Sequence, residues 1–507
     1  MRSLVSVRSF GEIAAEDDDI RRYFVQTPVF QELMSNARQV VLGRKGSGKT
    51  ALYLALIDRA GQQGYFAYGL TFRDYPWALH TKYVYEQGTQ YERYLPSWRF
   101  LALMQIFKTL LTEEQRPLRY TGGTARGALA GVERFIQANW GVLDFDHKKT
   151  FPSAGFRLDS ISVDPQIAGF GLGGVSVKRA SGGLGETLPR LNEWLWHVLR
   201  AVSSSAPTVF VLFDELDAGF DATNPDYSDR LVGLLLAVRA LTRDFQADRM
   251  PFRIVAFLRT DIFDTLHFGD KNKLTDANSI LLAWNTALRY EGSSLKQLID
   301  QRIREELALS AKDRDPWSKA FDGEVMRGTQ HKFHHMAARS YLRPRDLIKF
   351  CNAALDGAKR RIRTSIPPAD RITNNDVTAS RKVYSKYFLN ELDDEIAPID
   401  REWKDYLEIL RRIGAMRFSA DAFRKAYAAT RKRITYRLNE EEVLAFLYQY
   451  SIIGFERAVG GAGLVEHFRY QDEPVRFNPE ARAFLVHRAL KEALELREAG
   501  EAVDDIA

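Results

Sequence analysis

The feature that most constrains this chain is a glycine-rich loop between a short apolar segment and a helical one. Residues 39–42 are predicted to form a buried strand, and residues 51–57 a buried helix. The sequence between them follows the pattern GxxxxGK[ST], and this strand–loop–helix context separates a phosphate-binding loop from a chance match. The loop consists of Gly43, Arg44, Lys45, Gly46, Ser47, Gly48, Lys49 and Thr50.

Each part of this loop has a chemical purpose. Glycines let backbone N–H groups converge on phosphate oxygens without Cβ clashes, and the helix N-terminus adds partial positive charge. Lys49 is expected between the β- and γ-phosphates, and the Thr50 hydroxyl is expected to ligate Mg²⁺. Residues 272–276 are one residue too long for the NKxD motif that reads guanine. The sequence therefore predicts ATP and Mg²⁺ as ligands.

A second segment supplies the acidic half of such a site. Residues 208–213 are apolar or β-branched, as in a central parallel strand that is buried on both faces, and they lead into Asp214 and Glu215. The carboxyl end of this strand should lie beside the loop, where open α/β sheets bind their ligands. Asp214 is expected to hold the Mg²⁺ shell, and Glu215 to act as the general base on the attacking water.

A third apolar segment, residues 252–258, ends in Arg259 and Thr260. Residues 231–241 have helical periodicity, so a right-handed strand–helix–strand unit is expected between the two strands. In this class of nucleotide-binding core the next strand places a polar residue near the γ-phosphate. Arg259 is our choice for that role, and Thr260 is the alternative.

The distance along the chain between Thr50 and Asp214 indicates an insertion. A strand–helix–strand unit needs only about 30 residues, so residues 116–186 are predicted to be an insert that contains a β-hairpin. Residues 169–174 match GxGxxG, but the following residues alternate like a strand where a dinucleotide site requires a helix. We therefore do not assign a dinucleotide site there.

Composition favours a globular protein with several domains. Apolar residues make up 45% of the chain and charged residues 27%. No apolar run approaches the ~20 residues that cross a bilayer, and the first residues do not resemble a signal peptide. Cys351 is the single cysteine, as is usual in a reducing compartment. We expect a cytoplasmic protein without a membrane partner.

Together these motifs resemble the ASCE division of P-loop nucleoside triphosphatases, and within it AAA+ ATPases, with their STAND and origin-recognition-like branches. The chain also resembles an uncharacterised family of bacterial P-loop ATPases. Three segments carry this resemblance: the glycine-rich loop, a leader at the start of the chain, and Ser451-Ile452-Ile453-Gly454 at the end of a predicted helix. The leader positions are Phe10-Gly11, Ala15-Glu16-Asp17, Tyr23-Phe24-Val25 and Thr27.

The resemblance implies an α/β core with a parallel sheet, a helical lid and a C-terminal winged helix. Within the lid, Arg345 would lie at the start of a helix and reach the γ-phosphate, with Arg343 as the alternative. The expected domains are a leader (1–30), an ATPase core (31–290, with the insert 116–186), a helical lid (291–390) and a winged-helix-like domain (391–507).

Two segments are rich in basic residues, 357–387 and 424–437. They make nucleic acid a candidate partner, but the third helix of the expected winged helix, 440–453, contains no Lys or Arg for a DNA groove. The favoured function is an ATP-driven switch or motor, as a homo-oligomer or with a protein partner, and the resemblance suggests prokaryotic regulation or phage defence. The alternatives are a nucleic-acid-binding initiator or loader and a nucleotide-binding scaffold of low turnover.

Overall fold

The computed structural model describes residues 2–88, 90–114, 119–120, 122–158, 184–218, 224–288, 294–364, 370–459, 463–471 and 475–498. They belong to two compact units. One unit is Gln26–Ala283; the other combines Met1–Val25 with Trp284–Ala507. The first unit is therefore inserted, along the sequence, into the second.

The first unit is built on a five-stranded sheet in which every pair of neighbouring strands is parallel. The predicted α/β class with a parallel sheet is thus confirmed. The strand order is β2-β3-β4-β1-β5. The strands are β1 (Val40–Gly43), β2 (Phe66–Thr71), β3 (Val209–Asp214), β4 (Phe252–Arg259) and β5 (Ser279–Leu281).

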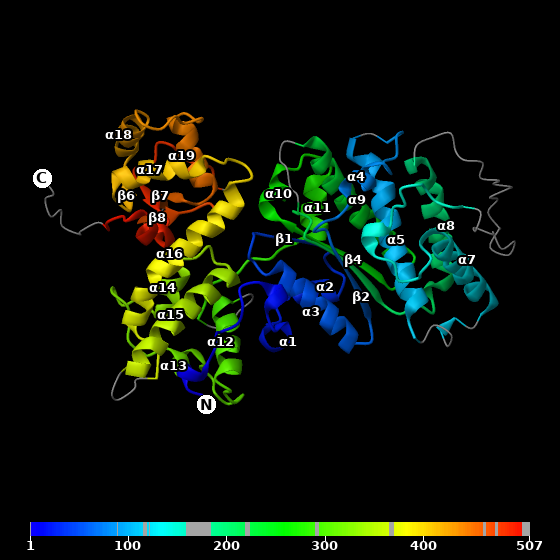
Figure 1. The fold of residues 1–507 in the computed structure, drawn as a ribbon, viewed down its shortest axis with the longest axis horizontal. Coiled ribbons are helices and arrows are strands. Elements are labelled where there is room, and N and C mark those ends of the chain that lie inside the picture. Colours follow the sequence, from blue (N-terminus) through cyan, green and yellow to red (C-terminus); the bar gives the residue numbers. More distant parts are fainter. Residues whose placement is uncertain are drawn as a thin grey trace, which may run out of the picture. The chain divides into compact units, whose positions relative to one another are not determined.

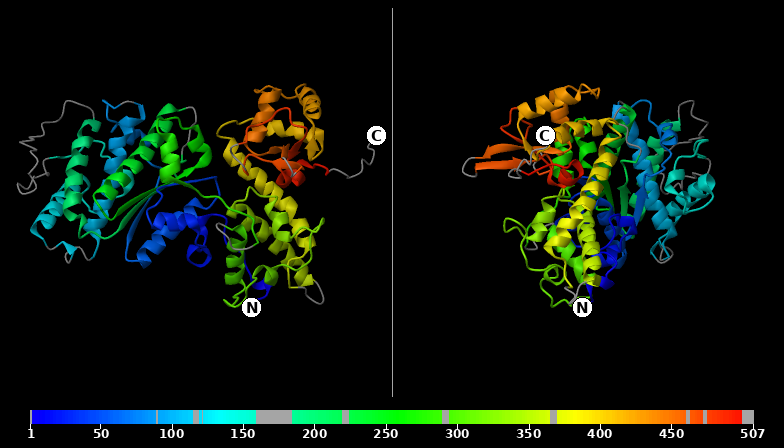
Figure 2. Two further views of the ribbon diagram at one scale, coloured as in Figure 1. Left: turned by 180° about the vertical axis from the view of Figure 1, so that it is seen from behind. Right: turned by 60° about the vertical axis from the view of Figure 1, so that its left-hand side comes forward.

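The inner strands are continuous apolar runs because helices cover both faces of the sheet. All residues of β1 and β3 are buried, whereas the edge strand β2 is mostly half-buried. Figures 1 and 2 show α2 and α3 on one face and α5 and α9 on the other. These helices are α2 (Pro28–Met34), α3 (Lys49–Gln62), α5 (Leu95–Thr112) and α9 (Pro225–Ala247).

The long segment between α3 and β3 is only partly an insertion. Its first portion contributes β2 to the sheet and α5 to the core. The predicted β-hairpin and the GxGxxG segment fall largely on residues 159–183, outside the described residues. The described remainder is helical, and the unit is completed by α4 (Trp77–Thr81), α7 (Gly123–Trp140), α8 (Leu188–Ser203), α10 (Thr260–Thr265) and α11 (Lys271–Asn278).

The second unit contains a helical part into which the N-terminal residues are packed. The backbone N–H of Phe10 donates to Asn352 Oδ1 at 2.7 Å, and Asp18 forms a buried ion pair with Arg302 at 2.5 Å. The leader is therefore an integral part of this unit. The helices here are α1 (Ile20–Tyr23), α12 (Leu295–Glu306), α13 (Trp317–Ala320), α14 (Lys332–Ala337), α15 (Pro344–Thr364) and α16 (Asn374–Ile396).

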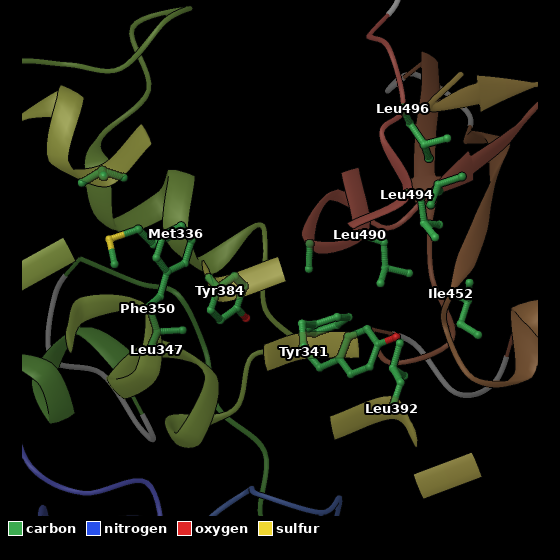
Figure 3. Close-up of a cluster of buried hydrophobic side chains, with 14 of the residues drawn as sticks. Met336, Tyr341, Leu347, Phe350, Tyr384, Leu392, Ile452, Leu490, Leu494 and Leu496 are labelled. Atoms are coloured by element: carbon green, nitrogen blue, oxygen red, sulfur yellow. The ribbon is translucent and has the colours of Figure 1, made fainter. Parts of the chain in front are cut away.

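The remainder of this unit holds a small antiparallel sheet with strand order β6-β9-β7-β8. Side chains of the helical part and of this terminal part share one core, which includes Tyr341, Leu392 and Leu490 (Figure 3). The elements are α17 (Trp403–Ile413), β6 (Arg417–Phe418), α18 (Ala420–Thr430), α19 (Glu440–Gln449), β7 (Ile453–Val459), β8 (Gly463–His467), β9 (Phe484–Val486) and α20 (Lys491–Leu494).

The prediction that the third helix runs to Ile453 is wrong. Helix α19 begins after Asn439, which forms a capping box with Glu442, but the helix ends at Gln449. Ser451 then adopts a left-handed conformation with φ 56°, and the β-branched Ile453 opens strand β7. In the part of the chain that the structure describes, no helix meets the length and apolar character needed to cross a membrane.

Candidate nucleotide-binding site

The glycine-rich loop joins β1 to α3, as expected from its sequence context. Gly46 and Gly48 have φ angles of 78° and 99°, which favour glycine strongly over other residues. A Cβ atom on Gly43 would lie 2.5 Å from Ser47 Oγ, so this glycine is needed for space. The N–H of Ser47 donates to the carbonyl oxygen of Arg44 at 3.1 Å and closes the turn that contains the half-buried Lys45.

Lys49, the first residue of α3, folds back over the loop. Its Nζ atom donates to the carbonyl oxygens of Gly43 at 2.9 Å and Arg44 at 3.0 Å. Burial lowers the pKa of Lys49 to about 8, although the nearby carboxylates of Asp217 and Asp214 act in the opposite direction. A bound polyphosphate would raise the pKa of this lysine again, because a nearby opposite charge favours the ionised form.

Asp214 and Thr50 lie together at the mouth of the loop. Asp214 is only 3% exposed, and its Oδ2 atom is buried without a hydrogen-bond partner among the described residues. Burial raises the pKa of Asp214 to about 6, while hydrogen bonds from the Glu215 backbone and the Thr50 hydroxyl partly offset that effect. A buried carboxylate oxygen beside a hydroxyl is a suitable pair of Mg²⁺ ligands.

A cation at this position would need further ligands from solvent or from a nucleotide. Within the described ranges, no group of three or more His, Cys, Asp or Glu side chains could hold a metal ion. This is compatible with Mg²⁺, which usually keeps several waters and binds through one or two protein groups together with substrate phosphates. The donor set at Thr50 and Asp214 therefore fits magnesium carried by a nucleoside triphosphate.

Glu215 has a left-handed backbone with φ 55°, which is uncommon for residues other than glycine. Its Oε1 atom forms an ion pair with Arg73 Nη2 at 2.5 Å. Because Thr71 lies opposite Asp214 in the parallel pairing of β2 and β3, the residues that follow these strands are brought together. Sequence reasoning missed Arg73; the only available signal was a basic residue just beyond a short strand-like segment.

The residues at the end of β4 reach the same edge of the sheet, because Arg259 pairs with Gly43 in the register of β4 and β1. Arg259 forms ion pairs with Asp261 at 2.6 Å and Asp217 at 3.3 Å. Burial alone would raise the pKa of Asp261, but Arg259 outweighs it and the net pKa is lowered. The Thr260 hydroxyl is buried and has no partner among the described residues. Both candidates thus lie near the loop.

Arg345 lies on α15, in the other unit. Its Nη1 atom forms an ion pair with Glu391 at 3.1 Å. The alternative, Arg343, is 2% exposed and is bound by Asp346 at 2.9 Å and Glu395 at 2.6 Å, so its guanidinium serves a buried structural network. The first unit therefore brings together the loop residues, Asp214, Glu215 and Arg259, while the role of Arg345 stays a prediction.

By its fold, the first unit is an α/β domain with an all-parallel sheet whose polar residues gather at the carboxyl edge. Comparison with known proteins concerns the second unit. Residues 293–393 match the family model of a FunZ-associated C-terminal helical domain, which spans α12 to α15 and most of α16. The match does not extend to the glycine-rich loop. No curated protein matches the chain.

Proposed function

We propose that this chain is an ATP-hydrolysing molecular switch or motor with its nucleotide site at residues 43–50, Asp214 and Glu215. The observation on which this rests is the buried, unpartnered Oδ2 of Asp214, which lies beside the Thr50 hydroxyl at the start of α3. The strand order supports the proposal, since β4 lies between β1 and β3, as in the ASCE nucleotide-binding cores that the sequence resembles.

Each residue has a definite task in this proposal. Lys49 would exchange its contacts with loop carbonyls for contacts with the β- and γ-phosphates. Thr50 and Asp214 would hold Mg²⁺, which supplies positive charge to the phosphate oxygens. Glu215 would orient and deprotonate the attacking water once it is released from Arg73. Arg259 or Thr260 would contact the γ-phosphate.

The test is steady-state ATP turnover by the full chain. Glu215→Gln keeps the shape of the side chain and removes the base, and Lys49→Ala removes the phosphate contact. Asp276→Asn, an exposed change on α11, is the matched control. We expect turnover in the control to equal that of the wild type and to fall at least about 100-fold in Glu215→Gln. An unchanged rate in Glu215→Gln would refute its role as the base, and no turnover in the wild type would favour a scaffold.

A second candidate function is nucleic-acid binding through the terminal part of the second unit. The order α17-β6-α18-α19-β7-β8 is similar to that of a winged helix. Arg431, Lys432 and Arg433, between α18 and α19, are exposed and make no ion pair with the described residues. They are free to contact phosphates, whereas the start of α19 is acidic and Glu440 is paired with Arg424 at 3.3 Å.

The basic segment 357–387 contributes less than its composition suggests. Arg361 is paired with Asp376 at 2.8 Å, while Lys382 and Lys386 are exposed on α16. DNA affinity as a function of salt concentration tests both segments, because each lost phosphate contact lowers the salt slope by about 0.9. Alanine substitution of residues 431–433 is expected to reduce the slope by about 2–3. An unchanged slope would exclude this loop, and the double variant Lys382→Ala/Lys386→Ala tests α16 in the same way.

A further inference from the structure

The second unit contains a buried arginine that forms no ion pair with the carboxylates that the structure describes. Arg339 follows α14 and is only 6% exposed. Its Nη1 atom donates to the carbonyl oxygen of His335 at 3.1 Å, and its Nε atom is buried without a hydrogen-bond partner. Among the described residues, no carboxylate lies within ion-pair distance of this guanidinium group. A buried charge in this position is strongly unfavourable unless something else compensates it.

Two further arginines on other elements, Arg381 and Arg488, act electrostatically on Arg339 and therefore lie near it. Arg381, on α16, has a buried Nε atom without a partner, its Nη1 atom is 3.9 Å from Glu492, and its Nη2 atom donates to Thr378 Oγ1 at 3.3 Å. Arg488, which begins the short helix η6 (Arg488–Leu490), is paired with Glu466 at 3.1 Å. Helix α16 packs against η6 and α20, so these side chains belong to one region. Part of the apolar core beside this region is drawn in Figure 3.

The titration behaviour of the region agrees with an excess of positive charge. Burial, followed by Arg381, lowers the pKa of Arg339 to about 10, although Glu492 and Glu498 partly oppose this. Glu498 itself is paired with Lys491 at 3.0 Å. Burial and then the three arginines lower the pKa of His335 to about 3, so the imidazole is neutral and the guanidinium groups provide the charge.

The positive charge and the N–H donors of these guanidinium groups suit a small oxyanion as a ligand. In Arg339, where Nη1 is bound to a backbone carbonyl, the planar edge formed by Nε and Nη2 can donate two parallel hydrogen bonds to two oxygens of a phosphate. The exposed fraction is 6% for the whole of residue Arg339, and 20% and 45% for the side chains of Arg381 and Arg488, so Arg339 is the most deeply buried of the three. The depth of Arg339 favours a small phosphorylated molecule over a polymer backbone, which would meet the exposed groups only.

We propose that Arg339, Arg381 and Arg488 form an anion site for the phosphate group of a small molecule. Arg339 would bind the anion at the inner end, Arg381 would contact it from α16, and Arg488 would attract it at the surface. Arg339 and Arg381 lie within the segment that matches the FunZ-associated helical domain. The site is distinct from the loop at residues 43–50, which belongs to the other unit.

The test is thermal unfolding of the full chain in sodium phosphate and in sodium chloride of equal ionic strength. All variants carry Lys49→Ala, so that the glycine-rich loop contributes little. At a phosphate concentration of about five times the Kd, mass action should raise Tm by about 2–4 °C. Arg339→Met should abolish this rise, whereas Arg412→Met, an exposed change on α17, should retain it.

In chloride, Arg339→Met should have a Tm equal to or above that of its parent, because it removes an uncompensated buried charge. If Arg339→Met fails to fold, Arg381→Met should reduce the phosphate response instead. An equal phosphate response in the parent and in the arginine variants would overturn the proposal, as would no response in the parent. Parallel titration with AMP separates the sources: a response to AMP assigns a nucleotide phosphate, and a response to phosphate alone assigns the free ion.

Discussion

Substitution of Asp214 by Asn offers a direct measurement of how strongly the candidate magnesium site is prepared for a cation. Asp214 is almost completely buried, and burial raises the pKa of its carboxyl group from 3.8 to about 6. In the absence of magnesium, the ionised carboxylate therefore destabilises the folded protein at neutral pH. Asn keeps the shape of the side chain and cannot ionise, so it removes this contribution.

The magnitude follows from the shift in pKa. Each unit corresponds to about 1.36 kcal/mol, so a rise of about 2.2 units costs the folded state about 3 kcal/mol at pH 7. Because the folded pKa is raised, the carboxyl group's contribution to stability is fully present below pH 3.8 and is lost as the pH rises through 6. Between pH 4 and pH 7, the wild type should lose about 2 kcal/mol relative to Asp214→Asn.

The assay is urea denaturation of nucleotide-free protein in EDTA, at several values between pH 4 and pH 7. A constant offset is expected as well, because the Asn amide places a buried donor where Oδ2 had no partner, at a cost of about 1–2 kcal/mol. The difference between the two pH limits does not depend on this offset. Asp276→Asn should follow the wild type throughout. Parallel curves for wild type and Asp214→Asn would refute the argument that burial of this charge prepares the site.

Three further predictions concern other contacts. Arg73→Ala should change the free energy of unfolding by less than about 1 kcal/mol, because Arg73 is 68% exposed, and should raise basal ATP turnover about two- to fivefold by releasing the proposed base; a lower rate would contradict this. Gly48→Ala should cost about 1–2 kcal/mol in urea denaturation through its φ of 99°, whereas Gly61→Ala, within the helix that follows Gly48, should stabilise by up to about 1 kcal/mol. Asp18→Asn should destabilise by about 3 kcal/mol, since Arg302 would stay buried without its partner, and an unchanged Tm would disprove the importance of the pair.

The strands of the parallel sheet differ in how well they can be predicted from the amino-acid sequence. Strands β1, β3 and β4 were predictable because central parallel strands are continuous apolar runs. Strand β2 was not predicted, because an edge strand is only half-buried and mixes Tyr68 and Gly69 with apolar residues. The end of α19 was misplaced for a related reason: a local apolar run at Ile452–Ile453 fits either a helix or a strand, and only tertiary pairing with β9 decides.

In the candidate site, too, some features can be predicted from local sequence and others depend on tertiary structure. The loop and Asp214 could be predicted as candidates because each belongs to a recognisable pattern of consecutive residues, and the structure places the loop between β1 and α3 and Asp214 at the end of β3. The ion pair between Arg73 and Glu215 depends on which strand lies beside β3, and no local pattern specifies that neighbour. The leader was recognised by resemblance as a separate segment, but its packing depends on residues such as Asn352 and Arg302, which lie hundreds of positions later in the chain.

The placement of the leader has a consequence for synthesis. Phe10 is separated by 342 positions from Asn352, to which its backbone is hydrogen-bonded. At translation rates of about 5–20 residues per second, the leader would wait roughly 17–70 s before its partner is made. During that interval Phe10 and Leu4, which are buried in the folded protein, have no hydrophobic core against which to pack. The α/β unit is synthesised meanwhile and can fold first. The side chains of Leu4 and Phe10 thus stay exposed on the nascent chain until the helices against which they pack have been made.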